Sequence, residues 1–176
     1  IVLHDYLAVN CEYDYANLKA NTLPSESFNI YGVFVKRAAV CQGYALAYKY
    51  LLNQVGIECH MVTSDVMDHA WNMVRLDGQY YQVDVTWDDP VWDLVGRATH
   101  NYMFCSDAVF QDENHKHHDW VVTKGSSVVD YRATDTRYDN AFWTDCTSPM
   151  VLSGNGCYYI SPVGWQGGPA LMKADL

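Results

Sequence analysis

The clearest hydrophobic pattern in the chain is a helical stripe over residues 39–55, AVCQGYALAYKYLLNQV. Apolar residues recur there every three or four positions, at Val40, Tyr44, Ala47, Leu51, Leu52 and Val55. This spacing predicts an amphipathic helix, and Gly56 follows it as a C-terminal cap. Residues 1–18 carry a similar stripe and predict another helix, with apolar positions at Ile1, Leu3, Leu7, Cys11, Tyr15 and Leu18. The polar, turn-rich residues 19–37 between the two helices predict a loop.

Strand-like runs follow the second helix. Residues 57–64 predict a short strand, and residues 69–77 and 79–87 are β-rich runs that meet at Asp77-Gly78. Asp-Gly between two such runs is a strong hairpin signal, because both central residues of a type I′ turn need a positive φ. We therefore predict an α+β chain with an antiparallel hairpin.

The pattern becomes less regular towards the C-terminus. Residues 88–125 show only a possible short strand within residues 100–110. From about residue 126 the sequence pattern changes to short strand-like runs separated by turns. These runs are YDNAFWTDC at residues 138–146 and SPMVLSGNGCYYIS at residues 148–161. We predict a core over residues 1–125 and a β-rich C-terminal extension over residues 126–176, which could also be the start of a further domain.

The hairpin fixes a register that brings two titratable side chains together. With Asp77 and Gly78 in the turn, the facing pairs are Leu76/Gln79, Val74/Tyr81, Trp71/Asp84 and His69/Thr86. Side chains alternate with period two, so His69 and Asp84 lie on one face as diagonal neighbours, roughly 7–8 Å apart at the backbone. An imidazole oriented by a carboxylate is the base half of a nucleophilic triad. A structural hydrogen-bonded pair is the alternative.

Cys41 stands at the start of the predicted central helix, where Ser, Thr, Asp or Asn is usual. The dipole and free N–H groups of a helix N-terminus favour a thiolate, and the Cys41 N–H could bind an oxyanion. Cys41 is therefore a candidate nucleophile, although a lone cysteine is more often a small buried residue.

Three ordered motifs resemble those of the transglutaminase-like superfamily, in its bacterial transglutaminase/protease-like branch. They are V-C-x-G-Y-A at residues 40–45, H-A-W-N at 69–72 and V-D-x-T-W-D-D-P at 83–90, and HNYMFCSD at 100–107 adds to the likeness. The resemblance covers about residues 1–120. It implies a papain-like α+β fold, with the nucleophile at the N-terminus of a central helix packed on an antiparallel sheet. It also implies thiol acyl transfer by a Cys41–His69–Asp84 triad.

Other site residues are weaker candidates. Tyr31 could supply a second oxyanion donor beside the Cys41 N–H, because a tyrosine often stands near this place in the resembling proteins, and Gln42 is the alternative. By the register, Trp71 lies on the face of His69 and is expected to wall the cleft. Trp87 is expected on the opposite face, in the core.

The resemblance leaves the reaction open among three functions. The first is a cysteine peptidase or amidase acting on protein, peptide or cell-wall peptide through a thioester. The second is a transglutaminase that crosslinks glutamine to amines, and the third is a non-catalytic surface module. The resembling branch is often exported or surface-attached and multidomain. We therefore expect an extracellular or cell-surface location within a larger chain.

Composition excludes several other classes. A net charge of −10 argues against a nucleic-acid partner, and no apolar run is long enough to span a bilayer. The six cysteines contain no C-x-x-C, so most are expected to be small buried residues, although disulfides stay possible. Within the cluster His115, His117 and His118, His115 and His117 could ligate a metal together with Cys59 and His60, but a polar surface loop is favoured. Asp88 and Asp89 are expected to cap or end the hairpin. We expect no metal and no cofactor.

Overall fold

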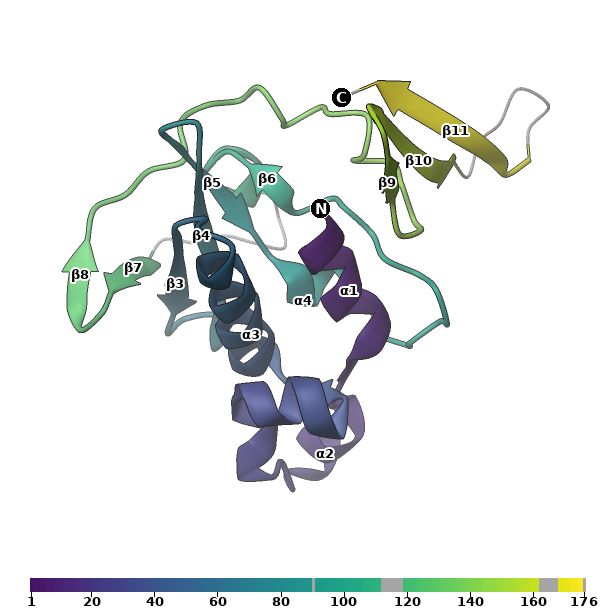
Figure 1. The fold of residues 1–176 in the computed structure, drawn as a ribbon. Coiled ribbons are helices and arrows are strands. Elements are labelled where there is room, and N and C mark those ends of the chain that lie inside the picture. The colour runs from purple at the N-terminus through teal and green to yellow at the C-terminus, as the bar shows by residue number, and fades with distance from the viewer. Residues whose placement is uncertain (90, 112–118, 162–167, 176) are drawn as a thin grey trace.

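The structure is a computed structural model that describes residues 1–89, 91–111, 119–161 and 168–175. Its centre is a six-stranded antiparallel sheet in the order β6-β5-β4-β3-β7-β8 (Figure 1). The strands are β3 (Cys59–Ser64), β4 (His69–Leu76), β5 (Gln79–Val83), β6 (Met103–Cys105), β7 (Val121–Lys124) and β8 (Ser127–Val129). The predicted strands at residues 57–64 and within residues 100–110 are confirmed by β3 and β6.

The predicted hairpin is confirmed at its turn. Asp77 and Gly78 have φ of 49° and 81°, as a type I′ turn requires. The pairs Leu76/Gln79 and Val74/Tyr81 are in the expected register. Because the two loop residues set the strand pairing locally, this part of the sheet could be read from the sequence.

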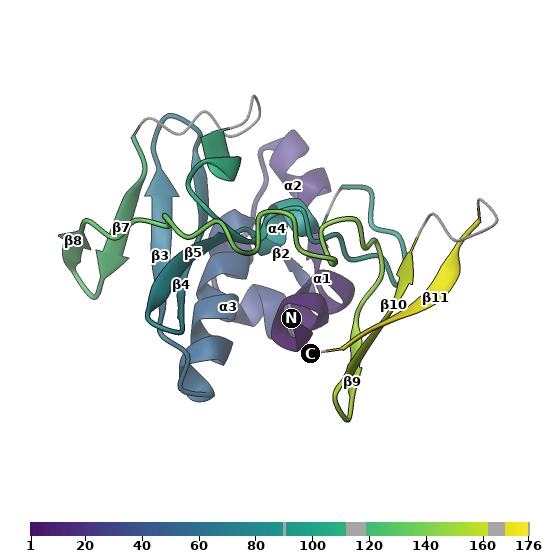
Figure 2. The same cartoon turned by 90° about the horizontal axis from the view of Figure 1, so that it is seen from above.

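The central helix α3 (Cys41–Gln54) begins at the cysteine and packs against β3 and β4. Figures 1 and 2 show α3 and α1 (Val2–Asn10) on the same side of the six-stranded sheet. Buried apolar side chains from both helices meet the sheet in one core, including Leu7, Tyr44, Tyr48, Val74, Tyr81 and Val83. The predicted α+β fold, with the cysteine at the start of a helix on an antiparallel sheet, is confirmed.

The other face of the sheet carries a separate, smaller core. It contains Val62, Trp71, Met73, Cys105, Phe110, Val122 and Ala133. Phe110 belongs to a 3₁₀ turn, Val109–Gln111, that follows β6. Adjacent residues of β4 therefore point into different cores, as period-two alternation requires.

The N-terminal region departs from the expected single helix over residues 1–18. Helix α1 ends at Asn10, β1 (Glu12–Tyr13) follows, and α2 (Tyr15–Ala20) is a separate short helix. β1 pairs in parallel with β2 (Ala38–Ala39), immediately before α3. This long-range pairing overrides the local helical pattern. Residues 19–37, expected as a loop, contain a 3₁₀ turn at Ser25–Phe28 and a π turn at Gly32–Lys36.

Gly43 allows the first turn of α3 to lie close against this region. A Cβ added there would come within 2.7 Å of the Ser27 carbonyl oxygen and 2.9 Å of the Ala39 Cβ. A backbone carbonyl cannot move aside as a flexible side chain can. The close approach of α3 therefore depends on the missing side chain.

We expect Gly43→Ala to destabilise the fold by about 1–3 kcal/mol, although alanine is normally the better helix former. The steric clash with Ser27 outweighs the gain of about 1 kcal/mol in helix propensity. Urea denaturation measures the change in the free energy of unfolding. Gln42→Ala, at the exposed neighbouring position, is the control and is expected to be nearly neutral. A stabilised Gly43→Ala variant would contradict the close approach.

A second antiparallel sheet, β9 (Val151–Ser153), β10 (Gly156–Ser161) and β11 (Ala170–Asp175), lies on the far side of α1 (Figures 1 and 2). The β9–β10 hairpin agrees with the strand-like pattern of residues 148–161. The strand expected at residues 138–146 is wrong, because successive backbone bonds between residues three apart make turns there.

Residues after the predicted division at residue 125 pack together with residues before it. This division falls within the β7–β8 hairpin, whose two strands pair in one sheet. Trp143, Cys146, Met150 and Cys157 are buried in the same core cluster as Leu7. The division into a core and an extension stays a prediction.

Within the described residues, no helix combines the length and the apolar character that a membrane crossing requires.

Candidate active site

Cys41 is the first residue of α3 and remains partly exposed, whereas the other five cysteines are buried. The helix start is held against the sheet by Asn72 on β4, whose Nδ2 donates to the carbonyl oxygens of Ala45 (3.0 Å) and His60 (3.3 Å). All six cysteines are free thiols, so the structure supports the reading of the other five as small buried residues. The thiol at the helix start is thus set apart by its exposure.

His69, the first residue of β4, donates from Nε2 to Asp84 Oδ2 over 2.5 Å. The expected facing pairs Trp71/Asp84 and His69/Thr86 are nevertheless wrong, because the ladder ends at Asn72 and Val83. Asp84 leaves the strand and caps a short helix, α4 (Val85–Asp88), through a bond from the Trp87 N–H to Oδ1 (3.1 Å). Helix capping and the imidazole therefore use different oxygens of one buried carboxylate.

Cys41 is close enough to His69 to raise the pKa of the imidazole, so the three predicted triad side chains lie together. Burial alone would lower the pKa of His69. The charge and hydrogen bond of Asp84, with a smaller effect of Cys41, outweigh burial and raise this pKa to about 10. The ring is an imidazolium at neutral pH and can give its proton to a leaving amine.

The raised pKa of His69 makes a prediction for stability. Its charged pair with Asp84 contributes fully below the unfolded pKa of 6.5 and is lost as pH rises through about 10. We expect His69→Gln to lower the free energy of unfolding by about 3–5 kcal/mol at pH 6. Denaturant titrations of both proteins between pH 6 and 10 should show this difference shrinking. A difference that grows with pH would contradict the assignment.

The two tryptophans of the motifs exchange their expected places. Trp71 is only 1% exposed and stacks between His69 (5.6 Å between ring centroids) and Phe110 (6.1 Å). It supports the imidazole from behind and does not wall the cleft. Trp87, expected in the core, is 37% exposed and lies edge-on to His69 at 5.9 Å, because α4 turns it away from the strand direction.

A cleft of about 380 Å³ opens over the imidazole. Its lining is Tyr13, Met67, His69, Thr86, Trp87, Asp89 and Val91. Tyr31 does not belong to this lining. It is 49% exposed, and its ring lies under the Lys36 ammonium at 5.8 Å. Gln42 is next to Cys41 in the chain and is exposed.

Tyr13 is a cleft residue that the pattern of the sequence does not predict. The β1–β2 pairing places it opposite Ala39, two residues before Cys41. Burial raises the pKa of its hydroxyl to about 12, with further contributions from Cys41 and nearby carboxylates. The hydroxyl therefore stays protonated and able to donate. Only the parallel pairing, which the helical pattern of residues 1–18 conceals, could have identified it.

Asp88 and Asp89 follow the hairpin, but they do not cap it. Both are buried. Asp89 Oδ2 accepts from the Tyr44 hydroxyl on α3 (2.5 Å), and burial raises the pKa of Asp89 to about 7. Asp88 accepts from His4 on α1 and from the Tyr102 N–H. These two carboxylates tie α4 to the helices that surround it.

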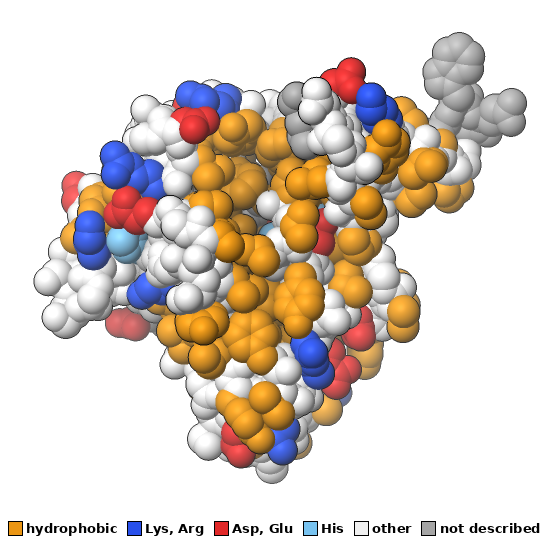
Figure 3. Space-filling model, in the orientation of Figure 1, with side chains coloured by type: hydrophobic (Ala, Val, Ile, Leu, Met, Phe, Trp, Pro, Cys, Tyr) orange, Lys and Arg blue, Asp and Glu red, His pale blue; other side chains and the backbone are white. Residues whose placement is uncertain are grey.

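Among the described residues, the structure does not bring together the histidines and the cysteine that were considered as metal ligands. His115, His117 and His118 lie outside the described residues. Cys59 is buried, which raises its pKa to about 12, and His60 Nε2 pairs with Glu58 (2.8 Å). Figure 3 shows hydrophobic side chains down the middle of one face, with acidic and basic side chains around its margins. The excess negative charge is therefore not concentrated at the centre of this face.

Comparison with known proteins agrees with the motifs. Residues 2–85 match the family model of the transglutaminase-like superfamily. Kyphoscoliosis peptidase of Homo sapiens is 26% identical over 104 residues, which cover 51% of this chain. The matched region spans only 15% of that relative's length.

Two solved structures resemble part of the chain. A TGase is 21% identical with a TM-score of 0.41, covering 47% of this chain and 24% of its own. A candidate cysteine protease from Cytophaga hutchinsonii is 20% identical with a TM-score of 0.38, covering 48% and 29%.

Proposed function

We propose that this chain, whose residues 2–85 are a transglutaminase-like superfamily segment, is a thiol-dependent acyl-transfer enzyme that acts on amide or peptide bonds. The observation that carries the proposal is the His69–Asp84 hydrogen bond beside a partly exposed thiol at a helix N-terminus. Cys41 is the nucleophile, His69 moves the proton, and Asp84 orients the ring. A merely structural histidine–aspartate pair would not need a partly exposed thiol beside it.

The reaction proceeds in two halves. The Cys41 thiolate attacks the carbonyl carbon and forms a C–S bond, and the tetrahedral intermediate expels the amine, which takes the proton from His69. The product is a thioester on Cys41. In the second half, water loses a proton to His69 and attacks the thioester, and the thiolate leaves as the acid is released. The negatively charged oxygen of each tetrahedral intermediate needs hydrogen-bond donors to stabilise it.

The oxyanion donors are the Cys41 N–H and the Tyr13 hydroxyl. N–H groups in the first turn of a helix have no partner within the helix. Tyr13 takes the role first assigned to Tyr31, because Tyr13 lines the cleft and carries a protonated hydroxyl. Gln42 stays the alternative donor, since its side chain is exposed beside the nucleophile.

We propose hydrolysis as the outcome, on a protein, peptide or cell-wall peptide substrate. The support is the human relative, which is named as a peptidase. Transglutamination is the alternative, because an amine and water compete for the same thioester. We also propose an extracellular or cell-surface location within a larger multidomain chain, on the resemblance to an often exported branch.

p-Nitrophenyl acetate tests the proposed thioester directly. We expect a burst of p-nitrophenolate and an acetyl group on Cys41, located by peptide mass spectrometry. A burst without modification of Cys41, or no burst from folded protein, would contradict the proposal. Incubation of a glutamine-rich protein with a fluorescent primary amine then separates the outcomes: release of ammonia without amine incorporation indicates hydrolysis, and incorporation indicates transglutamination.

A further inference from the structure

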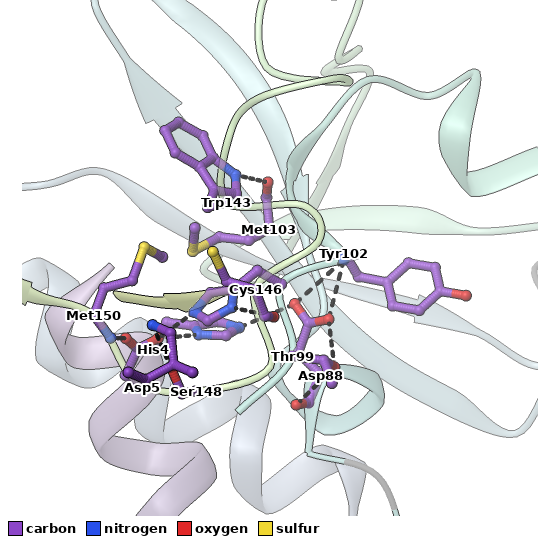
Figure 4. Close-up of polar contacts among 12 residues, drawn as sticks. His4, Asp5, Asp88, Thr99, Tyr102, Met103, Trp143, Cys146, Ser148 and Met150 are labelled. Atoms are coloured by element: carbon purple, nitrogen blue, oxygen red, sulfur yellow. Dashed lines mark hydrogen bonds and ion pairs between the residues drawn. The ribbon is translucent and has the colours of Figure 1, made fainter. Parts of the chain in front are cut away.

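A second cluster of titratable side chains lies buried away from the cleft. It consists of His4 and Asp5 on α1, Asp88 at the end of α4, and His100 before β6. Figure 4 shows the segment around Cys146–Met150 closing over this cluster. The proposed acyl transfer uses none of these four side chains.

All four ring nitrogens of the two histidines face acceptors. His4 Nδ1 lies 2.9 Å from Asp5 Oδ1, and His4 Nε2 lies 3.0 Å from Asp88 Oδ2. His100 Nε2 lies 2.9 Å from Asp5 Oδ1, and His100 Nδ1 lies 3.0 Å from the Cys146 carbonyl oxygen. A neutral histidine carries a single N–H. Two neutral rings can therefore donate in only two of these four contacts, which end on three acceptor oxygens.

Two of the ring nitrogens converge on a single oxygen. His4 Nδ1 and His100 Nε2 both face Asp5 Oδ1, and the three ligand atoms lie within 4.8 Å of one another. Each of the three side chains also has a hydrogen-bond partner on the side that faces away from Asp5 Oδ1. Asp88 and the Cys146 carbonyl accept from the other ring nitrogens, and the Met150 N–H donates to Asp5 Oδ2 (2.7 Å). A carboxylate or carbonyl behind each imidazole is the usual support of a metal-binding histidine.

We propose that His4, Asp5 and His100 form a buried site for a divalent transition metal, with Zn²⁺ the best match for two imidazoles and a carboxylate. Each imidazole would bind the ion as a neutral ligand through the ring nitrogen that faces Asp5, and Asp5 Oδ1 would supply the third bond.

The geometry needs a small adjustment. Tetrahedral ligands about 2.0 Å from zinc lie about 3.3 Å apart, so the two 2.9 Å contacts must widen by about 0.4 Å. The site departs from the expectation of no metal, because only the fold brings His100 to the N-terminal helix. The bound ion would link α1 to the segment that precedes β6 and so stabilise the folded chain.

The test uses the untagged chain with Cys41→Ala, so that the exposed thiol cannot bind the ion. After treatment with EDTA and dialysis, we expect ZnCl₂ to bind at about one ion per chain and to raise Tm. His100→Gln should remove both effects. His60→Gln, at the buried histidine that pairs with Glu58, is the control and should keep them.

X-ray absorption at the zinc edge of the loaded chain needs no histidine variant, so it keeps the proposal testable even if His100→Gln fails to fold. We expect it to show two imidazole nitrogens and oxygen ligands, with no sulfur. No zinc binding, with no change in Tm, would overturn the proposal. A sulfur ligand, fewer than two imidazoles, or binding that survives in folded His100→Gln would place the ion elsewhere and would equally overturn it.

Discussion

Replacing Cys41 by alanine is expected to abolish acyl-enzyme formation and to lower kcat for amide or ester substrates by about 10⁴-fold or more. The reason is that no other thiol can substitute for it. The remaining five cysteines are buried, and burial raises the pKa of Cys11, Cys59 and Cys146 to about 12. A thiol that stays protonated at neutral pH is a poor nucleophile.

Stopped-flow release of p-nitrophenolate and the mass of the intact chain measure this effect together. Cys59→Ala is the matched control, because it removes a buried thiol and leaves the contacts of Cys41 unchanged. We expect Cys59→Ala to keep the full burst amplitude. A Cys41→Ala variant that keeps the burst and the acetyl adduct would show that another group attacks the acyl carbon.

Truncation after residue 125 is expected to prevent cooperative folding. It removes Trp143, Cys146, Met150 and Cys157 from the core that also contains Leu7. The loss of a single large core side chain typically costs about 2–5 kcal/mol, and a whole domain is stable by only about 5–15 kcal/mol. The truncated chain also loses the Met150 N–H that holds Asp5 and the carbonyl that holds His100.

Circular dichroism during urea titration measures this loss. A chain that ends at residue 161 is the control, because it keeps the four core residues and lacks β11, whose side chains are mostly exposed. We expect that control to unfold in a single sharp transition. If the 1–125 chain unfolds with the same midpoint, then residues 126–176 are a separate extension, as the sequence pattern predicts.

The parts of the fold that the sequence predicted well are those decided by neighbouring residues. Asp77-Gly78 set both the turn and the register near it, and the helical stripe placed the start of α3 close to Cys41. His69 and Asp84 were expected together from that register. They do meet, although through a different geometry, because the strand ends one residue before Asp84.

The parts that the sequence could not supply depend on contacts between distant segments. Pairing of β1 with β2 splits the N-terminal helical pattern and brings Tyr13 to the cleft. The capping turn at Asp84 moves Trp87 from the expected core to the surface beside His69. The meeting of α1 with His100 joins residues 95 positions apart. Periodicity within one segment carries no information about such meetings.

The pH dependence of Cys41 alkylation tests whether His69 activates the Cys41 thiol, on which the proposed acyl transfer depends. Iodoacetamide rate constants would be measured from pH 5 to 9 for the wild-type chain and His69→Gln, with the modified residue located by mass spectrometry. We expect wild-type Cys41 to react about 10–100-fold faster than Cys41 of the variant at pH 6, and the two rates to converge towards pH 9. Superimposable profiles, both rising with pH as an ordinary thiol does, would contradict it.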